Sequence, residues 1–156
     1  MKNTVIIIPT RLGATRFPNK PLAKINNVPM IIHVLNKAKA SKVGEVYIAT
    51  PDNEIFQTVK EYGGKAVMTK KNHLSGSDRI YEVYKEKLSN DVDLIIGLQG
   101  DVPNIKPDDI LALEKFMRNN NCDIGTLAAD IKNKDEIVDP NIVKVQIDQT
   151  LKKILF

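Results

Sequence analysis

The feature that most constrains the fold of this 156-residue chain is the alternation of short apolar runs with amphipathic segments. Continuous apolar runs are typical of strands buried on both faces of a sheet, and apolar residues spaced three and four apart are typical of helices. The predicted strands are residues 4–10, 45–50, 65–69, 93–100 and 123–131. Because helical patterns separate them, we expect a three-layer α/β/α fold around a mainly parallel sheet. A terminal hairpin is predicted from residues 141–148 and 151–156.

The length and composition fit one soluble domain covering residues 1–156, without a visible linker or internal repeat. The apolar runs are too short to cross a bilayer, and the N-terminus lacks the pattern of a signal peptide. We therefore expect a cytoplasmic protein with no membrane partner. The single cysteine, Cys122, cannot form an internal disulfide and is predicted to be a small buried residue.

Although the net charge is +4, we expect no nucleic-acid partner, because the lysines are scattered and no DNA- or RNA-binding signature is present. Binding of DNA or RNA through the basic surface stays an alternative, and salt-dependent association with nucleic acid would test it. Only four of the 23 basic residues are arginines, namely Arg11, Arg16, Arg79 and Arg118. Arginine recognises phosphate and carboxylate in a bidentate manner, so arginines in loops suggest such a ligand.

Two loops are candidates for a binding site, because ligands of open α/β sheets bind outside the carboxyl ends of the strands. They are residues 9–22 and 99–103. The first carries Arg11, Arg16 and Lys20, an electropositive set suited to a polyphosphate. It lacks the second glycine and the hydroxyl of a Walker A loop. An ordinary basic surface loop stays the alternative.

Asp101 follows directly after the fourth predicted strand, within the sequence Gln99-Gly100-Asp101. A carboxylate in this position, with a glycine that allows close approach of the backbone, can hold a Mg²⁺ ion that bridges nucleotide phosphates. A turn-forming aspartate without a ligand is the alternative.

Residues 73–79 form a third candidate segment, HLSGSDR, at the start of a predicted helix. Ser and Asp there can cap the helix without any ligand, while Arg79 in the first turn can point at a phosphate or carboxylate. His73 is a candidate base or hydrogen-bonding group, and His33, inside a helix, is predicted to be structural. The sequence offers no nucleophile with a partner base, so covalent catalysis has no candidate. A basic loop together with a metal-binding acid indicates phosphoryl or nucleotidyl transfer.

Four motifs in order resemble the CMP-sugar-acid synthetase family, most closely its 3-deoxy-manno-octulosonate (KDO) cytidylyltransferase branch. The family loop P-A-R-x-x-S-x-R-x-P-G-K-P-L is matched at Pro9, Arg11, Arg16, Pro18, Lys20, Pro21 and Leu22. The motifs H-x-S-G-T-D/E-R, V-Q-G-D-E-P and N-P-N-x-V-K-V are matched by residues 73–79, 98–103 and 139–145. The resemblance covers essentially the whole chain.

The resemblance implies a nucleotide-diphospho-sugar-transferase-like (Rossmann-like) fold and the reaction of CTP with KDO to give CMP-KDO and pyrophosphate, for lipopolysaccharide biosynthesis. It also implies the site residues. Arg11 and Lys20 hold the triphosphate, and the catalytic set is Arg11, Lys20 and Asp101. Asp101 binds the Mg²⁺ cofactor, and Arg79 and Gln99 face the sugar acid. The cytidine contacts it implies are Ala14, His73, Ser75 and Gly76. A homodimer is left open.

Three departures from the family pattern matter: Ala14 replaces Ser, Asn19 replaces Gly and Val102 replaces Glu. Asn19 is the best substitute for glycine if its backbone is left-handed. Because family chains continue further, we expect these residues to be the N-terminal portion of the family's chain. Two alternatives follow: a catalytically impaired remnant that only binds CTP or CDP, and a CMP-sialic acid synthetase.

Overall fold

The computed structural model describes residues 3–13, 17–88, 92–120, 122–148 and 153–155. The chain divides into two compact units, Met1–Cys122 and Asp123–Phe156, which are described separately. The single domain predicted from the sequence stays a prediction.

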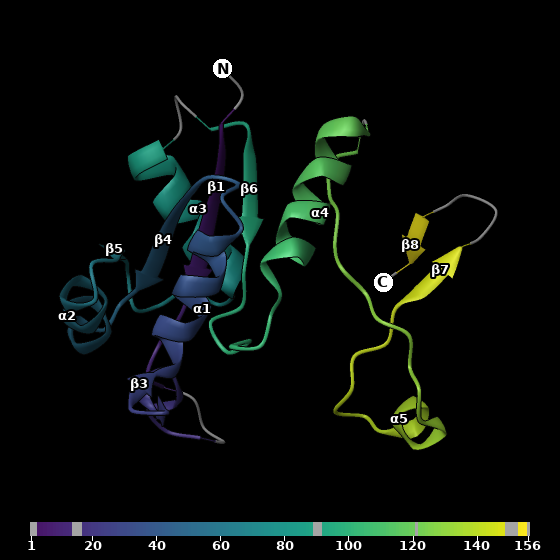
Figure 1. Ribbon diagram of the computed structural model, residues 1–156, viewed down its shortest axis with the longest axis horizontal. Coiled ribbons are helices and arrows are strands. Elements are labelled where there is room, and N and C mark those ends of the chain that lie inside the picture. The colour runs from purple at the N-terminus through teal and green to yellow at the C-terminus, as the bar shows by residue number, and fades with distance from the viewer. Residues whose placement is uncertain (1–2, 14–16, 89–91, 121, 149–152, 156) are drawn as a thin grey trace. The chain divides into compact units, whose positions relative to one another are not determined.

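The first unit is built on a parallel sheet of four strands in the order β5-β4-β1-β6 (Figure 1). The strands are β1 (Thr4–Pro9), β4 (Glu45–Thr50), β5 (Lys65–Met68) and β6 (Leu94–Gly97). In the register, Val5 lies opposite Glu45 on one side and Ile95 on the other. β1 is central and its residues are buried up to Pro9, as expected for a run of β-branched side chains inside a parallel sheet.

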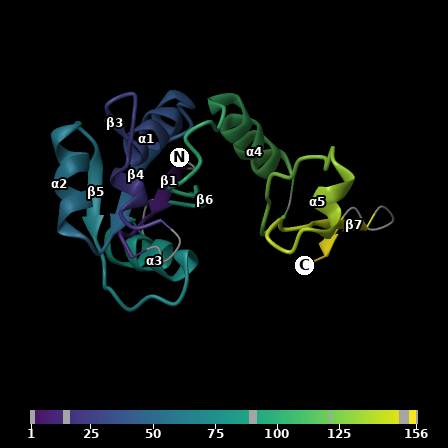
Figure 2. The same ribbon diagram turned by 90° about the horizontal axis from the view of Figure 1, so that it is seen from below.

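Helices cover both faces of this sheet. They are α1 (Met30–Ala40), α2 (Asn53–Glu61), α3 (Gly76–Val83) and α4 (Pro107–Asn119), with α3 continuing as a π-helical turn over Tyr84–Leu88. Alternate residues of β1 point to opposite faces. Ile6 and Ile8 pack in a cluster with residues of α1, α2 and α4, whereas Val5 and Ile7 pack with Val83 of α3. Figure 2 shows α1 and α3 on opposite sides of the strands, so the predicted three-layer α/β fold is confirmed.

Arg118, near the end of α4, forms hydrogen bonds at the amino ends of β1 and β6. Its guanidinium donates to Thr4 Oγ1 at 2.7 Å, to both carboxylate oxygens of Asp93 at 2.7 and 2.9 Å, and to Glu114 Oε1 at 3.1 Å. These hydrogen bonds, above all those with Asp93, raise the pKa of Arg118 above its usual value. Arg118 therefore connects α4 to the beginnings of β1 and β6.

The second unit lacks the fifth strand that the sequence predicts over residues 123–131. Residues 123–131 form neither strand nor helix, and Ile124 is 80% exposed. The strand prediction was wrong because an apolar run forms a strand only where a neighbouring strand accepts its hydrogen bonds. The short helix α5 (Lys134–Val138) follows. β7 (Gln146–Asp148) pairs antiparallel with β8 (Lys153–Leu155), which confirms a hairpin here, although residues 141–145 of its predicted first strand form no strand.

Two further expectations concern single features of the chain. Cys122 is exposed, so its predicted burial was wrong; it lies beyond the end of α4 and outside the helix face that packs on the sheet. None of the helices in the described part of the chain is both long and apolar enough to cross a membrane.

Candidate functional site

The loop after β1 is held against the neighbouring strand and helix. The Thr10 amide donates to the Ala49 carbonyl at 2.9 Å, and the Leu12 amide donates to Asp52 Oδ2 at 2.8 Å. Asp52 lies at the N-cap of α2, but its side chain makes no capping hydrogen bond. Its carboxylate accepts from the loop rather than from the amides of its own helix.

Asn19 ends this loop in the left-handed conformation, with a φ of 56°. The chain then turns into the 3₁₀ helix η1 (Lys20–Leu22), in which the Leu22 amide donates to the Asn19 carbonyl at 2.9 Å. Asparagine tolerates this backbone better than other non-glycine residues, so the interpretation of Asn19 as a glycine substitute is confirmed. The turn places Lys20 facing the end of β6. Ala14 and Arg16 lie outside the described residues.

The loop after β6 approaches the loop after β1 very closely at Gly100. A Cβ added to Gly100 would lie 3.2 Å from the Pro9 carbonyl oxygen and 3.2 Å from Thr10 Cβ. Gly100 therefore allows the two loop backbones to approach one another. Its predicted part in a Mg²⁺ site stays a prediction. Val102, where the family pattern has a glutamate, packs against the main core cluster.

The start of α3 forms the third side of the site. Ser75 is the N-cap, and its hydroxyl accepts from the Asp78 amide at 3.1 Å while the Asp78 carboxylate accepts from the Ser75 amide at 3.0 Å. This reciprocal capping box fixes where the helix begins. The capping interpretation of Ser75 and Asp78 is thus confirmed, and it leaves the cavity-lining position of Ser75 unaffected.

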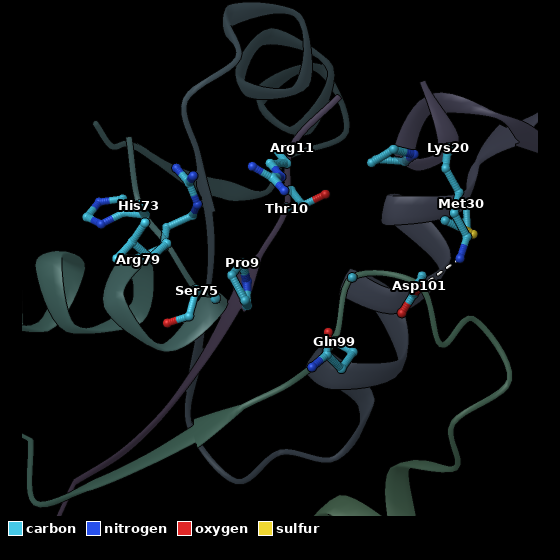
Figure 3. A pocket seen from close by; sticks show the side chains of 14 residues that line it. Pro9, Thr10, Arg11, Lys20, Met30, His73, Ser75, Arg79, Gln99 and Asp101 are labelled. Carbon is cyan, nitrogen blue, oxygen red and sulfur yellow. Dashed lines mark hydrogen bonds and ion pairs between the residues drawn. The ribbon is translucent and has the colours of Figure 1, made fainter. Parts of the chain in front are cut away.

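These three segments enclose one cavity of about 290 Å³ at the carboxyl ends of the strands (Figure 3). Every site residue predicted from the sequence, apart from Ala14, lines it: Arg11, Lys20, His73, Ser75, Gly76, Arg79, Gln99 and Asp101. The lining that the sequence did not predict includes Thr10, Met30 and the fully exposed Leu74. Residues far apart in the chain therefore meet here as the strand-end rule requires.

Lys20 and Asp101 form an ion pair across the cavity mouth, with 2.7 Å between Nζ and Oδ2 (Figure 3). Their side chains are 36% and 48% exposed, so solvent screens the pair. Exposed pairs of this kind contribute about 0 to 1 kcal/mol to stability. A ligand that offers both negative charge and a cation can therefore replace this contact at small cost.

Arg79 is 3% exposed although it lines the cavity. Its Nη1 donates to the Lys70 carbonyl at 3.0 Å and to Thr69 Oγ1. Burial, followed by the nearby positive charge of Arg11, lowers the pKa of Arg79. The predicted contact of Arg79 with a sugar acid stays a prediction, and the structure adds a second task, holding the segment that follows β5.

Glu82 was missed by the sequence reasoning. Its carboxylate accepts from His73 Nε2 and from the Lys70 amide at 3.1 and 3.2 Å. The only signal available was its spacing from Arg79, three residues along one helix face. His33 bonds the Ile25 carbonyl through Nε2 at 2.9 Å, consistent with the structural role expected of it.

The described residues contain no group of three or more His, Cys, Asp or Glu side chains that could hold a metal ion by themselves. Asp101 offers one carboxylate at the cavity mouth. Mg²⁺ is commonly bound by one or two carboxylates together with substrate phosphates and water. The donor set therefore fits a metal that arrives with a phosphate ligand, and does not fit a closed structural site.

The family model for cytidylyltransferases matches residues 5–156, and the chain therefore belongs to the cytidylyltransferase family. It is 47% identical over 152 residues to the 3-deoxy-manno-octulosonate cytidylyltransferase of Thermodesulfovibrio yellowstonii, covering 94% of this chain and 60% of that protein. It is 46% identical over 143 residues to the enzyme of the same name from Brucella canis, covering 91% and 57%. The resemblance found in the motifs is confirmed.

Solved structures agree with this assignment. The structure of CMP:2-keto-3-deoxy-manno-octonic acid synthetase complexed with CTP is 42% identical, with a TM-score of 0.72, over 76% of this chain and 48% of that one. A cytidylyltransferase from Leptospira borgpetersenii, 24% identical with a TM-score of 0.68, shows the same fold. The chain spans about 60% of the length of the curated relatives it matches.

Proposed function

We propose that this chain carries the nucleotide site of a cytidylyltransferase that activates KDO, converting CTP and KDO to CMP-KDO and pyrophosphate. The observation that carries the proposal is the meeting of eight predicted site residues around one cavity, among them the cationic Arg11 and Lys20 and the carboxylate of Asp101. The names of the relatives, and the CTP in the 42% identical structure, support the choice of nucleotide and sugar acid.

In the proposed reaction the 2-hydroxyl of KDO attacks the α-phosphorus of CTP in line, and pyrophosphate leaves. Arg11 and Lys20 bind the triphosphate and neutralise charge that develops on the leaving group. Asp101 would hold Mg²⁺ beside the phosphates, and the ion, once bound, would add to that neutralisation. With both ligands bound, Lys20 would pair with phosphate and Asp101 would hold the metal, so that each partner of the present ion pair would keep a counter-charge.

The other roles are proposals of the same kind. Ala14 and the residues His73, Ser75 and Gly76 contact the cytidine, and Arg79 and Gln99 face the sugar acid. The cavity position of the five described members of this set supports these roles. The proposal extends to a cytoplasmic enzyme of lipopolysaccharide biosynthesis, with a homodimer left open as its assembly.

Two measurements test the proposal on the protein as it stands. Isothermal titration with CTP and Mg²⁺ should give saturable binding, and a pyrophosphate-release assay should give turnover with KDO. Turnover with sialic acid in place of KDO would favour the sialic acid branch. Binding without turnover would support the remnant that only binds nucleotide, and absence of CTP binding would refute the nucleotide site.

Arg11→Ala gives the residue-level test. Because it removes charge-assisted hydrogen bonds to phosphate, we expect the Kd for CTP to rise about 10- to 100-fold, which corresponds to about 1.5 to 3 kcal/mol. The melting temperature should stay close to that of the wild type. An unchanged Kd would remove Arg11 from the triphosphate site.

A further inference from the structure

The segment between β5 and α3, residues 69–75, has no regular secondary structure. It nevertheless supplies His73, Leu74 and Ser75 to the wall of the cavity. A loop without its own hydrogen-bond ladder keeps one shape only where other elements bind it. The residues that determine the shape of this wall are therefore the ones that tether it.

Two side chains of α3, one helical turn apart, bind the loop at its beginning. The Lys70 amide donates to Glu82 at 3.1 and 3.2 Å, and the Lys70 carbonyl accepts from Arg79 Nη1 at 3.0 Å. Both polar groups of this residue's backbone are thus held by the helix. Glu82 also accepts from His73 Nε2, so one carboxylate joins the beginning of the loop to a residue of the cavity wall.

The contact between Glu82 and His73 is largely shielded from water, with 11% and 15% of the two side chains exposed. Burial acts to raise the pKa of Glu82, but the hydrogen bonds from His73 and the Lys70 amide outweigh it, and the pKa is lowered overall. A carboxylate shielded to this degree is stabilised by several donors, whereas a substitution leaves those donors without their acceptor.

We propose that Glu82 is a positioning residue for the nucleotide: it holds residues 70–73 in the conformation that completes the cavity wall, although it does not itself line the cavity. The inference rests on the proposed function for the identity of the ligand. Its physical basis is preorganisation, because a loop that is in its binding conformation for only part of the time lowers the apparent affinity by that fraction.

The test compares Glu82→Gln and Glu82→Ala with the matched control Glu86→Gln. Glu86 lies one turn further along, is exposed, and makes no hydrogen bond to the loop in the part of the chain that the structure describes. Hydrogen exchange of the free protein is measured over residues 69–75 and over β1, and CTP binding with Mg²⁺ is measured by titration calorimetry.

We expect Glu82→Ala to speed hydrogen exchange over residues 69–75. The Kd for CTP should rise about tenfold, as expected if the loop is in its binding conformation about a tenth of the time. Glu82→Gln keeps one acceptor oxygen and should lie between the wild type and Glu82→Ala. Exchange in β1 should rise less than exchange in the loop, because the largest loss of stability is local to residues 69–75. The control should change the Kd less than about twofold.

The inference is overturned if both Glu82 variants bind CTP as the wild type does, or if exchange rises equally in β1 and in the loop, since that result shows only a loss of global stability. If the wild type itself does not bind CTP, the proposed function fails and the nucleotide part of this inference fails with it. The exchange data on the free protein then still separate a tethered loop from an untethered one.

Discussion

The two ends of the parallel sheet use the same kinds of charged residue in opposite ways. At the amino end, Arg118 donates hydrogen bonds to Thr4, Asp93 and Glu114. At the carboxyl end, Arg11, Lys20 and Asp101 line a cavity, and the Lys20–Asp101 pair is partly exposed to water. Charges that satisfy one another stabilise the fold, whereas charges that face a cavity are available to a ligand.

Arg79 shows that position alone does not decide between these two uses. It lies at the carboxyl end and lines the cavity, yet it is buried and bonds the Lys70 backbone. An arginine in a loop or helix start can therefore act in packing and still be close to a ligand. The predictions below test how far the two ends differ, beginning with the largest effect.

Gly44→Ala should damage the amino end severely. An added Cβ would lie 1.9 Å from the Thr4 carbonyl oxygen, so the backbone of β1 or β4 must move. We expect a loss of at least about 3 kcal/mol of unfolding free energy, measured by urea denaturation. The matched control is Gly13→Ala in the loop after β1. There no atom of the described residues beyond its chain neighbours lies within 4 Å of the added Cβ, and the change should stay within about 0.5 kcal/mol. Equal losses of unfolding free energy at Gly44 and Gly13 would contradict the difference between the two ends of the sheet.

Arg118→Met should lower stability without affecting the ligand site. The variant keeps a long side chain but removes the hydrogen bonds that connect α4 with the beginnings of β1 and β6. We expect a loss of about 1 to 2 kcal/mol in unfolding free energy and an unchanged Kd for CTP. A large rise in the Kd would show that the two ends of the sheet are coupled.

The Glu82 tether at the carboxyl end should give stability that depends on pH. Its pKa is lowered from the usual value of 4.5 in the folded protein, so its contribution is fully present above pH 4.5 and is lost as the pH falls through the folded-state pKa. The charged or titratable groups around it are Lys70, His73, Asp78, Arg79, Lys85 and Glu86.

We therefore expect the wild type to exceed Glu82→Gln by about 1 kcal/mol in unfolding free energy near pH 6, and the difference to shrink toward pH 3. Thermal unfolding followed across this range measures the difference. Glu86→Gln, which alters a neighbouring charge without the tether, should show no comparable trend. A difference that stays constant with pH would show that ionisation of Glu82 does not stabilise the loop.

Much of the fold and of the candidate site could be predicted from the sequence. The runs around Ile6, Ile48 and Ile96 became parallel strands, since β-branched apolar residues bury both faces of such a sheet. The loops that follow them then had to meet at one edge, which brought Arg11 and Asp101 to the same cavity. Even the left-handed backbone of Asn19 followed from its residue type and its place in the motif.

Other features depended on neighbours that lie far away along the chain. Residues 123–131 are as apolar as a strand but have none of its hydrogen-bond partners, and Asp52 binds the Leu12 amide rather than its own helix. The partner of a carboxylate or of a backbone amide is chosen by three-dimensional proximity, which local patterns do not contain.

By itself, the sequence determined the alternation of strands and helices, the family, and the set of side chains at the carboxyl end of the sheet, because burial and chain direction follow from local patterns. Only the tertiary structure decided that Lys20 pairs with Asp101, that Arg79 is buried against Lys70, and that Glu82 holds His73. Each of these contacts joins groups whose charge is visible in the sequence but whose distance is fixed only when the layers pack.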